Sequence, residues 1–155
     1  AAALIRKFVP AWRVEIEKFF TLVLFNYAFS NGDAHLKNFA LLETESSDYF
    51  LSPAYDLINT RIHVDDTDFA LGKGLFVDDF QSGAFKKTHH RNKEDFLEFG
   101  RRIGIDEKRA ERLIAPFLIK QDKVEQLVQR SFLNDAIRRA YLPDYSTIRN
   151  RLNKA

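Results

Sequence analysis

Residues 19–42 read FFTLVLFNYAFSNGDAHLKNFALL, and they place a polar segment, NGDAHLKN at 31–38, between two apolar runs. Upstream of the polar segment, apolar side chains recur at i, i+3 and i+4 spacing, which predicts a buried helix over 11–30. The positions that carry this spacing are Trp12, Ile16, Phe19, Phe20, Val23, Leu24 and Tyr27. The pair Asn31-Gly32 tolerates positive φ and is expected to end the helix. The sequence therefore predicts a central helix that is followed directly by a polar loop.

Downstream of the loop, the short apolar runs 39–43 and 49–53 are joined by the polar residues TESSD. This pattern predicts a hairpin of two strands. Residues 54–90 show no sustained period, and a long irregular segment in a compact domain is more often functional than idle. The order of elements predicts a mainly α fold, helical with a small β-hairpin after the polar loop.

The last third of the sequence returns to helical spacing. Asn92 and Asp106 are each expected to cap the N-terminus of a helix. Residues 122–142 carry one broad apolar stripe, which predicts a single helix closed by Pro143. A final short helix is expected to start at Ser146.

The composition of the 155 residues fits one domain, 1–155. The chain is 45% hydrophobic and 30% charged, which is typical of globular proteins and not of disordered ones. Cysteine is absent, which excludes a disulfide framework, a thiolate metal site and a cysteine nucleophile. The formal charge of +2 gives no general reason to expect nucleic-acid binding. No signal peptide or membrane-spanning stretch is visible, so a cytoplasmic location without a membrane partner is expected.

Three side chains that offer oxygen atoms as metal ligands lie in or near the polar loop. Asp33 and Asn38 belong to the loop, and Asp56 follows the predicted hairpin, which returns the chain close to Asn38. An Asp, an Asn after four intervening residues, a hairpin and a further Asp are the arrangement of a protein-kinase-type catalytic lobe. Phosphoryl transfer needs a carboxylate to orient the attacking hydroxyl and hard oxygen ligands for Mg²⁺. It also needs a cation near the transferred group, which Lys37 can supply.

Each of these residues also has an ordinary structural explanation. Asp33 and Asn38 are typical of a solvated turn in which side chains cap backbone N–H groups. Asp56 is equally suited to cap the chain after a strand. His35 is more often a packing or hydrogen-bonding residue than a ligand, and we interpret it as an organiser of the loop.

The stretches NGDAHLKNFALL (31–42) and YFLSPAYDLINT (49–60) resemble the HipA-like serine/threonine kinases, the toxins of bacterial toxin–antitoxin modules. The loop follows that family's D-x-H-x-K-N order, with the His after the Asp. The segments 65–76 and 90–117 are also similar to the family's C-terminal region. The resemblance therefore covers most of the chain.

The resemblance implies a role for each matching residue. Asp33 would be the catalytic Asp, and Asn38 and Asp56 would be the ligands of Mg²⁺ beside ATP. His35 and Lys37 would be the other signature positions of the loop. The family also implies a protein substrate, such as an aminoacyl-tRNA synthetase, and a DNA-binding antitoxin as a partner.

A kinase of this family has an N-terminal lobe with a phosphate-covering loop and an ATP-binding lysine, and neither is found in this sequence. The closest glycine pair is Gly72 and Gly74, and a G-x-G-x-x-G motif would need a glycine where Val77 stands. Methionine is absent as well. The chain is therefore expected to be the C-terminal catalytic half of such a kinase, inactive by itself, with the missing lobe supplied in cis or in trans.

Two other functions stay open. The first is a non-catalytic module, derived from such a kinase, that binds a partner. The second is a metal-dependent phosphohydrolase that uses Asp33, His35 and Asp56, although other elements that usually accompany such a site are absent.

Two further features are open to more than one interpretation. His89-His90 is better explained by a solvated loop than by a metal site, because adjacent histidines point in different directions. The C-terminal end is rich in bases, namely Arg138, Arg139, Arg149, Arg151 and Lys154. These bases form either a solvated helix face or a surface for an acidic partner or nucleic acid.

Overall fold

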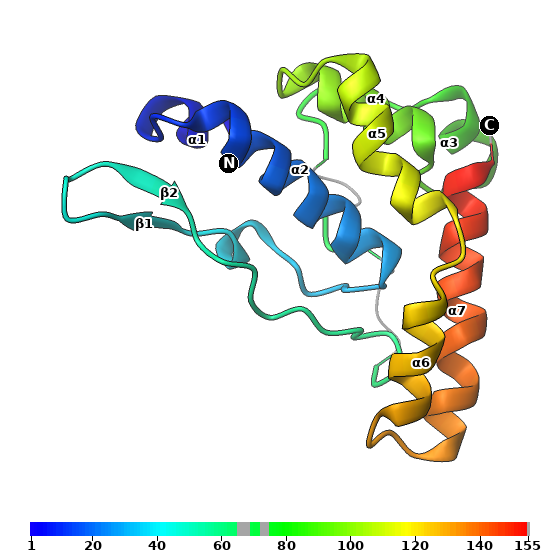
Figure 1. Ribbon diagram of the computed structural model, residues 1–155. Helices are drawn as coiled ribbons and strands as arrows, with labels where there is room; N and C mark the ends of the chain where they lie inside the picture. Colours follow the sequence, from blue (N-terminus) through cyan, green and yellow to red (C-terminus); the bar gives the residue numbers. More distant parts are fainter. Residues whose placement is uncertain (65–68, 72–74, 155) are drawn as a thin grey trace.

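The computed structural model describes residues 1–64, 69–71 and 75–154 (Figure 1). These residues form seven α-helices, a 3₁₀ turn and a two-stranded sheet. In chain order the elements are α1 (Ala2–Phe8), α2 (Trp12–Ala28), the 3₁₀ turn η1 (Leu36–Asn38), β1 (Leu41–Glu43), β2 (Tyr49–Leu51), α3 (Gly83–Thr88), α4 (Lys93–Arg102), α5 (Glu107–Leu118), α6 (Asp122–Arg130) and α7 (Asp135–Asn153). The prediction of a mainly α fold with one small hairpin after the polar loop is confirmed.

Helix α2 is the centre of the fold, as its apolar spacing predicts. The elements α1, β2, α5 and α7 all pack against it. Phe20, Val23 and Leu24 are fully buried, and the Phe20 ring stacks on Phe99 of α4 with centroids 5.8 Å apart. Burying each such side chain stabilises the fold by roughly 1.5–3 kcal/mol. Helix α2 is therefore a firm base for the loop at its C-terminal end.

The end of α2 differs from the prediction. The helix stops at Ala28, and the residue with positive φ is Ser30, at 53°, instead of Asn31 or Gly32. The cause is a contact with a residue far along the chain. The Ser30 carbonyl accepts hydrogen bonds from the N–H (3.2 Å) and the hydroxyl (3.3 Å) of Thr60. The N–H of Gly32 donates to the same hydroxyl oxygen at 2.8 Å.

The hairpin forms where it is predicted. Strands β1 and β2 pair antiparallel, with Leu41 opposite Leu51. Leu51 is buried, and its N–H donates to Oε2 of Glu15 at 3.1 Å, which ties the hairpin to α2. At the tip, the N–H of Thr44 donates to the carbonyl of Asp48, and the two side chains are also hydrogen-bonded. The hairpin therefore leaves the body of the protein and returns to it beside the polar loop.

Both capping predictions are confirmed. The side chain of Asn92 accepts hydrogen bonds from the N–H groups of Glu94 and Asp95 at the start of α4. The side chain of Asp106 accepts a hydrogen bond from the N–H of Arg109 at the start of α5. These caps satisfy donors that the first turn of a helix leaves without a partner.

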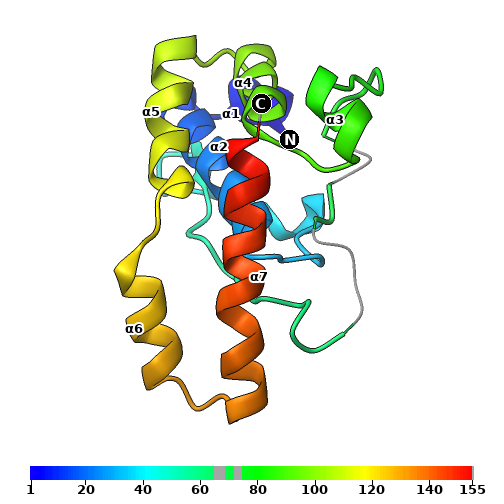
Figure 2. The same cartoon turned by 90° about the vertical axis from the view of Figure 1, so that its right-hand side faces the viewer.

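The prediction of one helix over 122–142 is wrong. Helix α6 ends at Arg130, and α7 begins at Asp135. Asn134 starts the new helix, because its side chain accepts the N–H of Ile137 at 3.0 Å. The apolar stripe continues across the break, so periodicity alone does not reveal it. Figures 1 and 2 show that α7 runs back alongside α6 as a helical hairpin.

Helix α7 also corrects the prediction of its end. It continues through Pro143 and Ser146, so neither a helix end nor a new helix occurs there. Proline removes one backbone hydrogen bond from a helix interior. Beyond the proline, Tyr145, Ile148 and Leu152 are buried, and that burial offsets the lost bond.

In the described part of 54–90, the segment predicted to be irregular, the structure has one short helix, α3. It is capped by Ser82, whose Oγ accepts the N–H of Phe85 at 3.0 Å. The runs at 65–68 and 72–74, which belong to the family-like stretch DDTDFALGKGLF and include the closest glycine pair, lie outside the described residues. Within the described ranges, no helix combines the length and the apolar character that crossing a membrane requires.

Candidate active site

Asn31 anchors the polar loop. It is buried, and its Nδ2 donates to Oδ1 of Asn26 at 3.1 Å and to the backbone carbonyl of Asp56 at 2.9 Å. Its Oδ1 accepts the N–H of Asp33 at 3.3 Å. One carboxamide therefore joins the last turn of α2, the start of the loop and the backbone of Asp56. Each such hydrogen bond contributes about 1 kcal/mol to stability.

Asn38 and Asp56, which are predicted to share a metal ion, are in contact. Nδ2 of Asn38 donates to Oδ2 of Asp56 at 2.6 Å, although the two residues are 18 positions apart. Oδ1 of Asn38 is buried and has no hydrogen-bond partner within the described part of the chain. Asp56 has a positive φ of 55°, a conformation that Asp tolerates better than most residues.

The oxygen atoms of this pair fit a magnesium ion. Mg²⁺ prefers oxygen ligands and is usually held by one or two protein side chains together with water and phosphate oxygens. Asn38 offers a carbonyl oxygen without a partner, and Asp56 offers a carboxylate beside it. A buried carbonyl oxygen without a donor calls for a bound ion or water. The donor set therefore agrees with the predicted ligands.

Asp33 and His35 form a second pair. Nε2 of His35 lies 3.5 Å from Oδ1 of Asp33, and the two side chains are 54% and 53% exposed. The N–H of His35 also donates to the carbonyl of Asp33 at 2.7 Å. The Asp33 carboxylate is therefore accessible from solvent and has an imidazole at its side.

Lys37 is exposed. Its backbone carbonyl accepts a hydrogen bond from the hydroxyl of Tyr55 at 3.3 Å. Tyr55 directly precedes Asp56, so this contact places Lys37 next to the segment that carries the second predicted metal ligand. The ammonium of Lys37 makes no ion pair or hydrogen bond with any described residue and remains accessible to a ligand.

The structure therefore joins the predicted site residues as two pairs, Asn38 with Asp56 and Asp33 with His35. Asn31 links the two pairs, because it binds the backbone of both Asp33 and Asp56. Among the described residues no direct contact joins the carboxylates of Asp33 and Asp56. That the two act on one ligand stays a prediction.

The phosphohydrolase alternative loses support. Residues 1–64, 69–71 and 75–154 contain no group of three or more His, Cys, Asp or Glu side chains that is able to hold a metal ion. Asp33, His35 and Asp56 thus do not form the three-ligand cluster that this alternative needs. His89 and His90 belong to no such group either.

Two residues that build the site are absent from the predicted set, Asn31 and Thr60. The sequence gives Asn31 a local signal, because it directly precedes the Gly-Asp pair of the loop and lies at a helix end. Thr60 has no local signal. Its partners, Ser30 and Gly32, are 30 and 28 positions away, and only the folded chain brings them together.

Residues 1–128 match the family described as "HipA-like C-terminal domain". The chain is similar to a Haemophilus influenzae protein named "Putative kinase", with 26% identity over 121 residues, which are 74% of this chain and 35% of that protein. It is also similar to the Sinorhizobium fredii protein named "Putative kinase Y4dM", with 36% identity over 56 residues, which are 36% of this chain and 14% of that protein. The chain thus spans about a third of the length of the first relative and less of the second.

Proposed function

The chain belongs to the family of HipA-like C-terminal domains, and from this membership we propose that it supplies the catalytic residues of a serine/threonine protein kinase. The reaction is transfer of the γ-phosphoryl group of ATP to a protein hydroxyl. Both relatives carry the word kinase in their names, which supports this class of reaction.

The contact between Asn38 and Asp56, 2.6 Å long, is the observation that carries the proposal. It brings two hard-oxygen side chains together across the hairpin, one of them with an oxygen atom that lacks a partner among the described residues. These two residues would hold Mg²⁺. The ion, when bound, neutralises charge on the ATP phosphates.

Asp33 would orient the attacking hydroxyl and accept its proton, because its carboxylate is half exposed and accepts no backbone N–H within the described residues. His35, 3.5 Å from that carboxylate, would fix its direction. Lys37 would place a positive charge near the transferred group, where it stabilises the charge that develops in the transition state.

The activity of the whole protein is part of the same proposal. The chain covers 35% of the Haemophilus influenzae relative, so we assign the loop and lysine that grip the ATP phosphates to another part of the polypeptide or to a second chain. By family resemblance, the whole protein would be the toxin of a toxin–antitoxin module. Its substrate would be a protein such as an aminoacyl-tRNA synthetase, and a DNA-binding antitoxin would be its partner.

Phosphorylation with labelled ATP by the intact protein tests the proposal. Asp33→Asn and Asp56→Asn should each lower the rate by about a hundredfold or more, while circular dichroism shows an unchanged fold. Asp122→Asn is the matched control, because this exposed carboxylate lies in the first turn of α6, and it should leave the rate unchanged. Activity that persists in Asp33→Asn would remove Asp33 from the catalytic role. An intact protein that neither binds Mg-ATP nor transfers phosphate would be a partner-binding module.

A further inference from the structure

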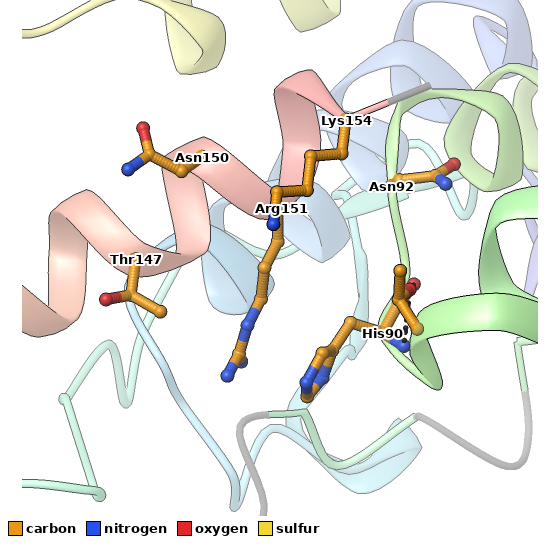
Figure 3. Close-up of a pocket in the computed structure, with 7 residues that line it drawn as sticks. His90, Asn92, Thr147, Asn150, Arg151 and Lys154 are labelled. Atoms are coloured by element: carbon orange, nitrogen blue, oxygen red, sulfur yellow. Dashed lines mark hydrogen bonds between the residues drawn. The ribbon is translucent and has the colours of Figure 1, made fainter.

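A polar pocket, of about 330 Å³, lies between α7 and the segment that joins α3 to α4 (Figure 3). Its lining residues are polar or basic throughout: Thr88, His90, Asn92, Thr147, Asn150, Arg151 and Lys154. None of these lining residues carries a carboxylate. The pocket shares no residue with the loop and hairpin of the candidate active site, so it needs a separate explanation.

The local electrostatic potential of this pocket is positive. Burial lowers the pKa of His90, and four basic neighbours lower it further, namely Arg151, His89, Arg61 and Lys154. Burial lowers the pKa of any histidine, whereas the part that comes from these four neighbours is the effect of positive charge around the ring. In Figure 3 the side chain of Lys154 folds back along α7 toward Arg151. A pocket of this sign favours an anion.

The pocket also contains N–H donors that lack an acceptor within the described residues. Asn92 is 2% exposed, and its Nδ2 has no hydrogen-bond partner there. The carboxamide of Asn150 and the ammonium of Lys154 make no hydrogen bond either. By contrast, the two threonine hydroxyls already donate to backbone carbonyls. Arg151 has a partner of its own and adds charge. Asn150 and Lys154 are exposed, so their N–H donors are available to a ligand in the pocket, whereas the buried Nδ2 of Asn92 lies behind the pocket surface.

We propose that this pocket binds a phosphate monoester, such as the side chain of a phosphorylated serine. A phosphate monoester carries about −1.5 to −2 charges at neutral pH and three acceptor oxygens, which suit a cluster of cations and unpaired N–H donors. A nucleic-acid backbone would instead need a basic stripe. Of the other bases of the C-terminal end, Arg138 pairs with Asp135 and Arg149 lies over the ring of Tyr145, and neither they nor Arg139 line the pocket. The proposal does not depend on the kinase activity.

Isothermal titration of the intact protein with a phosphoserine peptide tests the proposal, with the unphosphorylated peptide and inorganic phosphate as parallel ligands. The phosphoserine peptide should bind saturably at one site, and the unphosphorylated peptide should not bind. Lys154→Ala and Asn150→Ala should each weaken binding by about tenfold, because each removes a donor to a charged group. Lys123→Ala is the matched control, because it removes an exposed lysine of α6 outside the pocket, and it should leave the affinity unchanged.

The source of the phosphate follows from the same titrations. Tighter binding of the peptide than of inorganic phosphate, with the same dependence on Lys154, identifies a phosphorylated protein side chain as the ligand. Equal affinity identifies a small phosphate compound in the same pocket. Three results would overturn the proposal: no saturable binding of either ligand, equal loss of affinity in Lys154→Ala and Lys123→Ala, or tighter binding of a single-stranded oligonucleotide than of both ligands.

Discussion

Asp56 is a proposed metal ligand, and its backbone has an unusual conformation. Its φ is 55°, its carbonyl accepts the amide of Asn31, and its carboxylate accepts the amide of Asn38. A left-handed conformation costs an L-residue roughly 1–2 kcal/mol. Strained residues persist where surrounding contacts hold them, and they cluster at functional sites. The two hydrogen bonds therefore set the direction of the carboxylate at the expense of backbone strain.

This strain predicts the order of stability of two variants. Asp56→Gly should be more stable than Asp56→Ala by about 1 kcal/mol, because both remove the carboxylate and only glycine adopts positive φ freely. Urea unfolding measures the difference. At Asp33, whose φ is not positive, the alanine variant should be the more stable one. The same order at both positions would contradict the explanation.

Asn31 predicts a coupled effect on stability and metal use. Asn31→Ala should lower the free energy of unfolding by about 2 kcal/mol, because it leaves the buried carboxamide of Asn26 and the backbone carbonyl of Asp56 without this donor. It should also raise the Mg²⁺ concentration needed for half-maximal phosphoryl transfer. Gln126→Ala, which removes an exposed carboxamide of α6 outside both sites, is the control for both measurements. Lower stability with unchanged Mg²⁺ dependence would make Asn31 a structural residue alone.

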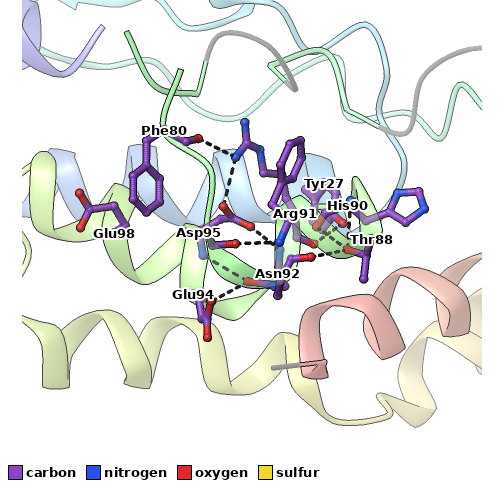
Figure 4. Close-up of polar contacts among 12 residues, drawn as sticks. Tyr27, Phe80, Thr88, His90, Arg91, Asn92, Glu94, Asp95 and Glu98 are labelled. Atoms are coloured by element: carbon purple, nitrogen blue, oxygen red, sulfur yellow. Dashed lines mark hydrogen bonds and ion pairs between the residues drawn. The ribbon is translucent and has the colours of Figure 1, made fainter. Parts of the chain in front are cut away.

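At the level of elements, a buried polar network fixes the start of α4 (Figure 4). Nη1 of Arg91 lies 3.1 Å from Oδ1 of Asp95, whose Oδ2 accepts the N–H of Asn92 at 3.0 Å. The hydroxyl of Tyr27 in α2 donates to the carbonyl of Arg91 at 2.6 Å. All four residues are buried, and burial raises the pKa of Tyr27. The network thus attaches α4 to the central helix.

Asp95→Asn should lower the free energy of unfolding by about 3 kcal/mol, because it removes the buried negative charge that faces the Arg91 guanidinium. Thermal or urea unfolding measures the loss. The control is Asp135→Asn, since Asp135 is 77% exposed and pairs with Arg138 at the surface. An exposed pair of this kind contributes under about 1 kcal/mol. Similar losses in the two variants would contradict the assignment of the network.

Another face of α4 predicts a dependence of stability on pH. Hydrogen bonds from Arg101 and Arg102 lower the pKa of Glu98 from 4.5 to about 2. A lowered carboxyl pKa stabilises the fold above the unfolded value, and this contribution is lost as the pH falls from 4.5 toward 2. Because Glu98 is partly exposed to solvent, the loss should be about 1 kcal/mol. Urea unfolding at neutral and at acidic pH measures it. Glu98→Gln should lose less stability on acidification, and an equal loss would contradict the assignment.

The elements that the sequence predicts well are those with local signals. Helix α2 has its apolar spacing, the hairpin has two short apolar runs around a polar turn, and α4 and α5 have the caps Asn92 and Asp106. The break between α6 and α7 also had a local signal, Asn134, but the continuous apolar stripe concealed it. Continuity of α7 through Pro143 depends on burial of the following turns, which only the tertiary structure supplies.

In the whole molecule, the hairpin of α6 and the first half of α7 stands apart from the other helices (Figures 1 and 2). Val128 is the buried residue of α6. The buried residues of α7 are Tyr145, Ile148 and Leu152, and all of them lie in its second half. A segment with few buried apolar contacts opens at a lower free energy than the core.

Native-state hydrogen exchange should therefore reveal two classes of helix. We expect amides in 122–130 and 135–142 to exchange well before those of α2 and α4, because opening this hairpin exposes little of the core. Mass spectrometry of exchanged peptides measures the order. Equal protection of the hairpin and of α2 would mean that the protein unfolds as one cooperative unit.

The fold class was within reach of the sequence because it follows chain order: helix, loop, hairpin and Asp. The same order predicts the contact between Asn38 and Asp56. The pocket beside His90 was not within reach, because it joins the segment before α4 to the last turns of α7. In the sequence its residues belong to two separate features, a histidine pair and a basic C-terminal end. Only their positions in space give them a shared purpose.

The antiparallel pairing of β1 and β2 also provides a place to attach a label or tag away from the site. Asn38 and Asp56 lie at the open end of the hairpin, whereas Thr44 and Asp48 close its far end. In Figure 1 that far end points away from the helices. A fluorescent label or an affinity tag inserted at 45–47 would lengthen the chain at an exposed turn. The insertion should not change the distance in space between the side chains of Asn38 and Asp56. The protein can thus be immobilised or observed through a point that is near its chemistry along the chain and remote from it in space.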